Sequence, residues 1–166
     1  GAFYGCSKLT SITIPSGLES IMESTFHGCS SLTSVTFPEN SQLISILDEA
    51  FSDCSKLTSI TIPSGLESIM KSTFFDCSSL TNITIPESVK SIGQNAFRGC
   101  SSLASITIPG SVTTLPLGTF ANCKSLTNVT INEGVTSIGN SSFSDCSKLL
   151  SIIIPSSVKS IGDLPF

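Results

Sequence analysis

The amino-acid sequence predicts a solenoid of about seven turns, with one turn for every 23 residues. The first observation behind this prediction is a pattern, Phe-x-x-Cys-x-x-Leu-x-x-Ile-x-Ile-Pro, that repeats along the whole chain. The second is its spacing, because the leading phenylalanine recurs after 23 residues at every step except one, which takes 25. This column consists of Phe3, Phe26, Phe51, Phe74, Phe97, Phe120, Phe143 and Phe166. Self-similarity at such a period is typical of solenoids, in which each turn packs on its neighbours.

Each turn contains one short segment with the alternation of a half-buried β-strand. In the first turn Ile12 and Ile14 alternate with Ser11 and Thr13, and this period of two indicates a strand. A proline follows the strand in every turn except the one that carries Asn132, at a place where a missing N–H is tolerated. Stacked in register, these segments are expected to form a parallel β-sheet on one face of the solenoid.

The rest of each turn is expected to contain two further elements. Apolar residues three apart predict short second strands around residues 18–21 and 89–92. The stretch from the phenylalanine to the leucine of each turn, such as residues 96–103, suits a short helical or 3₁₀ turn on the outer side. Gly93, Gly139 and Gly162 occupy one position after the second strand, and we expect a positive φ there.

The domain organisation follows from the repeat. Residues 1–166 are expected to form a single solenoid domain, a fragment of a longer array, because Gly1 opens within a repeat and Phe166 begins an unfinished one. The long interval holds two extra residues after Pro38, so we expect a small loop at residues 39–42. Residues 6–22 and 54–70 are identical, which indicates that the duplicated unit was two turns.

One cysteine occurs in each turn, always at the same position. The seven are Cys6, Cys29, Cys54, Cys77, Cys100, Cys123 and Cys146. A disulfide framework has less regular spacing, so we interpret them as small apolar residues that fill one core position repeatedly. Disulfides between adjacent turns and a reactive cysteine at one end are the alternatives.

Charge and motifs argue against several classes of function. The chain has 8 basic and 12 acidic residues, a net charge of −4, and lacks the clustered basic footprint of a nucleic-acid-binding protein. It contains no apolar run of about 18 residues, so we expect no membrane insertion. We also expect no enzymatic activity, cofactor or metal. The single His27 has no partner motif, so we expect its side chain to face solvent. Asp53, Asp76 and Asp145 precede cysteines at a position that other turns fill with glycine or asparagine. Such small residues suit the end of a helical turn, and calcium binding by the three aspartates is the alternative.

The repeat also resembles a known family. The unit Leu80-x-x-Ile83-x-Ile85-Pro86-x-x-Val89-x-x-Ile92-Gly93-x-x-Ala96-Phe97-x-x-Cys100 closely resembles the BspA-like class of leucine-rich repeats, in its 23-residue subtype, and the resemblance covers the entire chain. It implies a right-handed, curved leucine-rich repeat solenoid on a cell-surface or secreted protein, although the chain shows no signal peptide. It also implies adhesion to host or extracellular-matrix proteins. Pro116 in place of glycine and Asn132 in place of proline depart mildly from the pattern.

The predicted binding face consists of the side chains that point outward from the sheet. They are Ser11, Thr13, Ser34, Thr36, Ser59, Thr61, Asn82, Thr84, Ser105, Thr107, Asn128 and Thr130. A flat array of hydroxyl and amide groups can bind a host or matrix protein through many weak contacts. The structural alternative is that threonine is simply a good strand former.

Two further expectations concern partners and modification. The alternative function is a structural spacer, or a solenoid that assembles end to end without a specific ligand, because neither end carries a polar capping turn. Asn82, Asn128 and Asn140 lie in glycosylation sequons, so they are candidate glycan sites in a eukaryotic secretory host.

Overall fold

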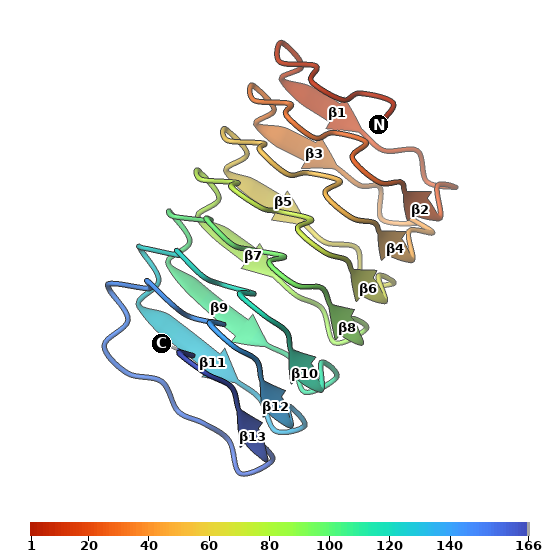
Figure 1. The fold of residues 1–166 in the computed structure, drawn as a ribbon. Helices are drawn as coiled ribbons and strands as arrows, with labels where there is room; N and C mark the ends of the chain where they lie inside the picture. Colours follow the sequence, from red (N-terminus) through yellow and green to blue (C-terminus); the bar gives the residue numbers. More distant parts are fainter. Residues whose placement is uncertain (166) are drawn as a thin grey trace.

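The computed structural model describes residues 1–165, and Phe166, which was predicted to begin a further repeat, lies outside them. Thirteen short β-strands follow one another along the described chain. The chain winds as a stack of similar turns, with the first and last turns at opposite ends (Figure 1). The predicted solenoid is therefore confirmed. We number its turns 1 to 7 from each phenylalanine of the repeat, beginning at Phe3.

The first strand of each turn lies on one face, which we call the strand face. Its strands are β1 (Ser11–Thr13), β3 (Ser34–Thr36), β5 (Ser59–Thr61), β7 (Asn82–Thr84), β9 (Ser105–Ile108) and β11 (Asn128–Ile131). Paired strands are parallel and in the predicted register, with Thr13 opposite Thr36 and Thr61 opposite Thr84. β9 and β11 are one residue longer because the N–H of Asn132 donates to the carbonyl of Ile108 at 3.0 Å. Proline, which stands at this position in the other turns, cannot make that bond.

The strand face is not one continuous sheet. Its backbone ladders join β1 to β3, β5 to β7 and β9 to β11, as three separate pairs. Between these pairs β3 lies beside β5, and β7 beside β9, without a ladder (Figure 1). The sheet is thus interrupted after every second turn, the same two-turn unit that the sequence duplicates.

The predicted second strands are present, although each is only two residues long. β2 (Ser20–Ile21), β4 (Ser45–Ile46), β6 (Ser68–Ile69) and β8 (Ser91–Ile92) form one sheet. β10 (Thr114–Leu115), β12 (Ser137–Ile138) and β13 (Ser160–Ile161) form another.

Pro116 contributes to the gap between these two sheets. At the equivalent position the N–H of Met70 donates to Ile46 at 3.0 Å, and that of Gly93 donates to Ile69 at 2.8 Å. Proline has no N–H to donate, so this bond of the ladder is lost between β8 and β10. This departure from the repeat leaves the solenoid intact but divides the second sheet between turns 4 and 5.

The outer side of each turn contains single turns closed by i→i+3 bonds, such as those from the N–H of Cys100 to Phe97 at 3.2 Å and from that of Leu103 to Cys100 at 3.0 Å, as expected. These turns do not continue into a helix anywhere within residues 1–165. The reason lies in where the backbone N–H groups point. The N–H of Phe74 donates to Ala96 and that of Asp76 to Arg98, both at 2.8 Å, so these groups bond to the next turn. Equivalent bonds join every pair of neighbouring turns and form a continuous outer ladder.

Left-handed residues make this outer ladder possible. The position before each cysteine has a positive φ, for example 70° at Gly28 and 51° at Asp76, which explains the small residues there. The expectation of a positive φ at Gly93, Gly139 and Gly162 is wrong, since none of them lies in the left-handed region. At Gly93 a Cβ atom would instead collide with the backbone of Lys71.

The core consists of columns of like side chains stacked along the solenoid axis. The phenylalanine rings stack almost parallel from Phe3 to Phe143, with centroids 5.2–5.6 Å apart and interplanar angles of 3–11°. The leucine and isoleucine columns beside them are buried in the middle turns. Because each ring contacts the rings above and below, every turn is stabilised by its two neighbours.

Candidate functional site

The strand face carries the side chains that the sequence singled out for binding. The structure places all twelve on the surface, while the residues between them point inward, as Ile60 and Ile83 do with 4% and 6% exposure. Parallel pairing sets serine or asparagine beside serine or asparagine, and threonine beside threonine. Two columns of uncharged polar groups result, and sequons at Asn82, Asn128 and Asn140 are exposed as well.

These columns differ from a third column of threonines that lies just before the strands. In the third column the hydroxyls donate to carbonyls of the preceding turn, as Thr33 does to Thr10 (2.9 Å) and Thr81 to Thr58 (3.2 Å). Among the twelve side chains of the binding face, only Asn82 has a hydrogen-bond partner within residues 1–165. The remaining hydroxyl and amide groups of this face are free to bond to a partner.

Two grooves lie where the strand face is interrupted, and sequence reasoning did not identify them. The larger, of about 500 Å³, lies between β7 and β9 and is lined by Thr84, Pro86, Glu87, Thr107 and Pro109, among others. The smaller, of about 360 Å³, lies after β3 and β5. A signal was present in the sequence: the residue after the strand proline is a glutamate in turns 2 and 4 and a serine in turns 1 and 3.

The smaller groove resembles the larger one in the kinds of side chain that line it. Its lining includes Phe37, Pro38, Glu39, Thr61 and Pro63. Each groove therefore combines prolines and other apolar side chains with one carboxylate, at the corresponding place in the two-turn repeat.

The cysteines contribute to the core rather than to this surface. Cys29, Cys54, Cys77, Cys100, Cys123 and Cys146 are buried, and no disulfide joins any of the seven cysteines. Each buried thiol donates to the carbonyl of the phenylalanine one turn earlier at 3.1–3.3 Å, as Cys77 does to Phe51. The expectation of a core position is wrong for Cys6, which is exposed.

Burial also sets the ionisation of these thiols. It raises the pKa of Cys54 from 9.0 to about 12, helped by the neighbouring Cys29. Burial likewise raises the pKa of Cys77 and of Cys100 well above the ordinary value. A thiol held protonated is a poor nucleophile and metal ligand, so Cys54, Cys77 and Cys100 have a structural role.

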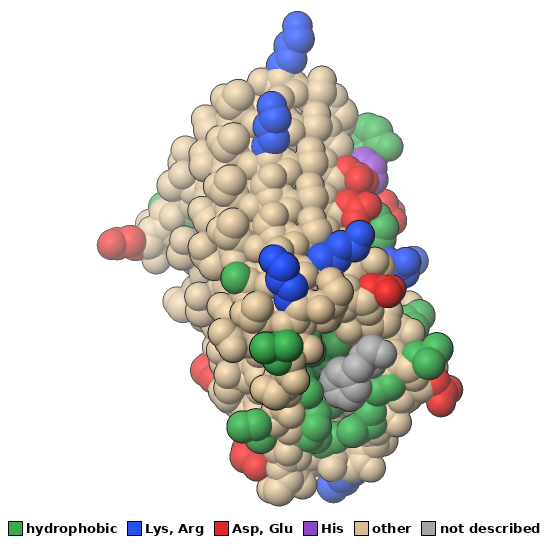
Figure 2. All heavy atoms as spheres, turned by 90° about the vertical axis from the view of Figure 1, so that its left-hand side faces the viewer, with side chains coloured by type: hydrophobic (Ala, Val, Ile, Leu, Met, Phe, Trp, Pro, Cys, Tyr) green, Lys and Arg blue, Asp and Glu red, His purple; other side chains and the backbone are tan. Residues whose placement is uncertain are grey.

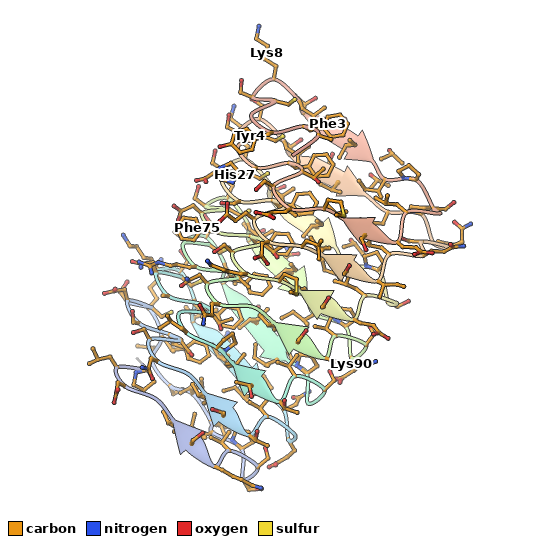
Figure 3. All side chains as sticks on the ribbon, turned by 45° about the vertical axis from the view of Figure 1, so that its right-hand side comes forward. Phe3, Tyr4, Lys8, His27, Phe75 and Lys90 are labelled. Carbon is orange, nitrogen blue, oxygen red and sulfur yellow. The ribbon has the colours of Figure 1, made fainter. Side chains whose placement is uncertain are left out.

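His27 does not face solvent as expected, because it is only 22% exposed. Its ring stacks on Tyr4 at 4.8 Å with an interplanar angle of 2°, and the two lie in one column on the outer side with Phe75 further along (Figure 3). Nδ1 lies 3.7 Å from a carboxylate oxygen of Glu49, and Nε2 lies 3.6 Å from one of Asp53. Sequence reasoning missed this cluster because its members come from three different turns.

The charges of the surface are sparse. On the side shown in Figure 2 most of the surface is uncharged, with scattered basic side chains, acidic groups beside the histidine and apolar side chains near the C-terminal turn. Residues 1–165 contain no group of three or more His, Cys, Asp or Glu side chains arranged to hold a metal ion. No helix in this part of the chain has the length and apolar character needed to cross a membrane.

Comparison with known proteins places this geometry in a family. Residues 1–116 and 44–166 match the model of the BspA type leucine rich repeat region, in six copies. Among solved structures, a leucine rich repeat protein of T. pallidum is 35% identical, with a TM-score of 0.82, over 89% of this chain and 68% of that chain. A leucine rich cell surface protein from Faecalibacterium prausnitzii is 28% identical, with a TM-score of 0.61, over 97% of this chain and 61% of that chain.

A leucine-rich repeat protein from Eubacterium ventriosum is also similar, at 25% identity and a TM-score of 0.79, over 95% of this chain and 42% of that chain. No curated protein matches. The family model covers the whole length, and the phenylalanine, cysteine and leucine columns of its repeat are the columns that stack in the core. The chain therefore belongs to the BspA-type leucine-rich repeat family.

Proposed function

We propose that this chain is a non-enzymatic, protein-binding segment of a cell-surface or secreted protein, and that its strand face mediates adhesion to host or extracellular-matrix proteins. The observation that carries the proposal is the array of exposed hydroxyl and amide groups, of which all except that of Asn82 lack a hydrogen-bond partner within residues 1–165. Similarity to a leucine rich cell surface protein supports the location.

The strength of such binding has to come from many turns together. A hydrogen bond contributes only about 0.5–1.5 kcal/mol net, and the strand face offers its side chains singly rather than in a deep pocket. A large partner surface that contacts several turns at once gains from the regular spacing. A small molecule that contacts one turn does not, so a protein partner is favoured.

A charge-substitution experiment tests the strand face. The variant Thr61→Lys, Thr84→Lys, Thr107→Lys places three cations on neighbouring turns of the exposed face. We expect it to lose binding to matrix proteins such as collagen and fibronectin, measured by biolayer interferometry, while its circular dichroism spectrum is unchanged. Binding that survives this triple substitution would remove the strand face as the site.

A matched control separates a local effect from a general effect of charge. The variant Ile44→Lys, Gln94→Lys, Thr113→Lys adds the same charge at three exposed positions outside the strand face. It should bind as the unsubstituted chain does. If both variants lose binding equally, the cause is net charge and the strand face has no special role.

A second candidate function is end-to-end assembly, and exposed apolar side chains favour it. In the first turn an apolar recess of about 630 Å³ is lined by Phe3, Ile14, Leu18 and Met22, among others. In the last turn a recess of about 520 Å³ is lined by Phe143, Cys146 and Leu149, among others. Light scattering over a concentration series should show growth of assemblies, and a strictly monomeric profile would exclude this function for residues 1–166.

A further inference from the structure

The two grooves of the strand face repeat at an interval of two turns, and each has a carboxylate at its edge. We propose that they hold lysine or arginine side chains of a partner segment that lies across the turns in a polyproline II conformation, with basic residues three positions apart. This inference rests on the proposed function, because it names the part of a partner protein that the same face binds.

The groove walls fit the stem of a long basic side chain. Phe37, Pro38 and Pro63 line the smaller groove, and Pro86 and Pro109 line the larger. Lysine and arginine bury their methylene groups against such apolar surface and keep the charged end in water. The groove openings reach the outward-facing threonines of the strand face, so a segment lying on that face can place side chains into both.

The carboxylates supply the charge complementarity. Glu39 and Glu87 are exposed, and neither has a hydrogen bond or ion pair with another side chain in residues 1–165. Their equivalent two turns later is already occupied, because Glu133 accepts hydrogen bonds from Ser156 and Ser157 at 3.0 Å. Those bonds from Ser156 and Ser157 also lower the pKa of Glu133. Two glutamates at this position are therefore open to an external cation.

The spacing of the two carboxylates fits a partner segment in the polyproline II conformation. Glu39 and Glu87 each follow the strand proline, in turns 2 and 4. Hydrogen-bonded strands lie about 4.8 Å apart, and β3 and β5 are not hydrogen-bonded, so these backbone positions are at least about 9.6 Å apart. A polyproline II helix rises about 3.1 Å per residue with three residues per turn, so residues i and i+3 share a face about 9.3 Å apart. In a β-strand, residues i and i+3 point to opposite sides, which makes an extended β-strand a poor fit.

Fluorescence anisotropy with labelled peptides tests the inference on the chain of residues 1–166. The probe is a proline-rich peptide with arginines at every third residue, and peptides of the same composition with arginines two or four residues apart are the comparison. We expect the three-residue spacing to bind best and its affinity to fall between 50 and 300 mM salt. Glu39→Gln and Glu87→Gln should each lower the affinity for this peptide about two- to fivefold, as is typical of the loss of an exposed ion pair.

Two exposed glutamates outside the grooves provide the matched controls. Glu19→Gln and Glu23→Gln make the same change of net charge, and each should leave peptide binding within experimental error of the unsubstituted chain. Equal weakening by all four substitutions would show that only the overall field attracts the peptide and would overturn the groove sites. Equal binding of the three spacings would overturn the polyproline II register.

The outcomes also distinguish this inference from the proposed function. If the lysine variant of the strand face loses binding to matrix proteins but no basic peptide binds, the proposed adhesion through the strand face is supported. The segment that the strand face binds is then not a basic polyproline II segment. If that lysine variant keeps binding to matrix proteins while the peptide binds through Glu39 and Glu87, peptide binding in the two grooves is supported and the proposed adhesion through the strand face is refuted.

Discussion

Alkaline pH should unfold this protein through its buried thiols. Cys54, Cys77 and Cys100 are fully buried, and burial raises the pKa of each thiol, to about 12 for Cys54. In the unfolded chain the same groups ionise near 9.0. The folded state therefore retains protons that the unfolded state has lost, and the stabilisation, which is complete below pH 9, falls as the pH rises towards the folded-state pKa.

The expected loss is large compared with the stability of an ordinary domain. Each thiol lowers the free energy of unfolding by about 1.4 kcal/mol per pH unit above its unfolded pKa. At pH 11 the three thiols together remove about 8 kcal/mol relative to neutral pH. Domains are stable by about 5–15 kcal/mol, so a loss of this size unfolds a domain in the lower half of that range by pH 11 and leaves a more stable one with about half of its stability.

Urea titrations between pH 7 and pH 11 in the presence of a non-thiol reductant provide the measurement, followed by far-UV circular dichroism because the chain has no tryptophan. Cys77→Ala should reduce the slope of unfolding free energy against pH by about 1.4 kcal/mol per unit. Leu80→Ala is the control, since it also creates a cavity in the core but removes no ionisable group. An unchanged slope in Cys77→Ala would refute the burial of this thiol.

Three further predictions concern packing, the ladder and thiol access. Leu80→Ala in the middle of the stack should cost about 2–5 kcal/mol in urea unfolding, and Leu149→Ala, at a partly buried position, should cost less; equal losses would contradict nearest-neighbour stacking. Pro116→Met should supply an N–H that donates to the carbonyl of Ile92 and should raise the free energy of unfolding by about 1 kcal/mol. Hydrogen exchange at the new amide should be slow, and fast exchange would contradict a role of Pro116 in the gap. Iodoacetamide should label Cys6 in the folded protein and the fully buried cysteines only after denaturation, as mass spectrometry of peptides will show.

Much of the fold could be predicted because the repeat carries its own spatial information. Once one turn corresponds to one interval between phenylalanines, equal positions must stack, and the alternation of Ile12 with Ser11 and Thr13 decides which side chains face outward. The register of β1 against β3 and the exposure of their hydroxyls follow directly. The same reasoning put the middle cysteines inside, and it failed at Cys6 because that position has no described turn before it to cover the thiol.

The outer ladder, the grooves and the contacts of His27 could not be predicted, because the repeat does not specify where individual N–H groups and side chains point. The four residues from Phe74 to Cys77 are compatible with a helical turn, and it is the positive φ at Ser72 and Asp76 that goes with N–H groups directed towards the next turn. The grooves arise where paired strands separate, which a repeat of identical units does not reveal. The contacts of His27 require the side chains of three turns to be placed in space.

The unequal bonding of the two sides has a mechanical consequence. Between turns 4 and 5 no ladder joins β7 to β9 on the strand face, and none joins β8 to β10 in the second strands. The outer ladder continues there through the bonds from Phe74 to Ala96 and from Asp76 to Arg98. The rod therefore resists bending least at this boundary, with the outer ladder as a spine and the strand face as the side that opens or closes. We expect a change in the curvature of the solenoid to be concentrated at this joint, with the packing inside either half unchanged.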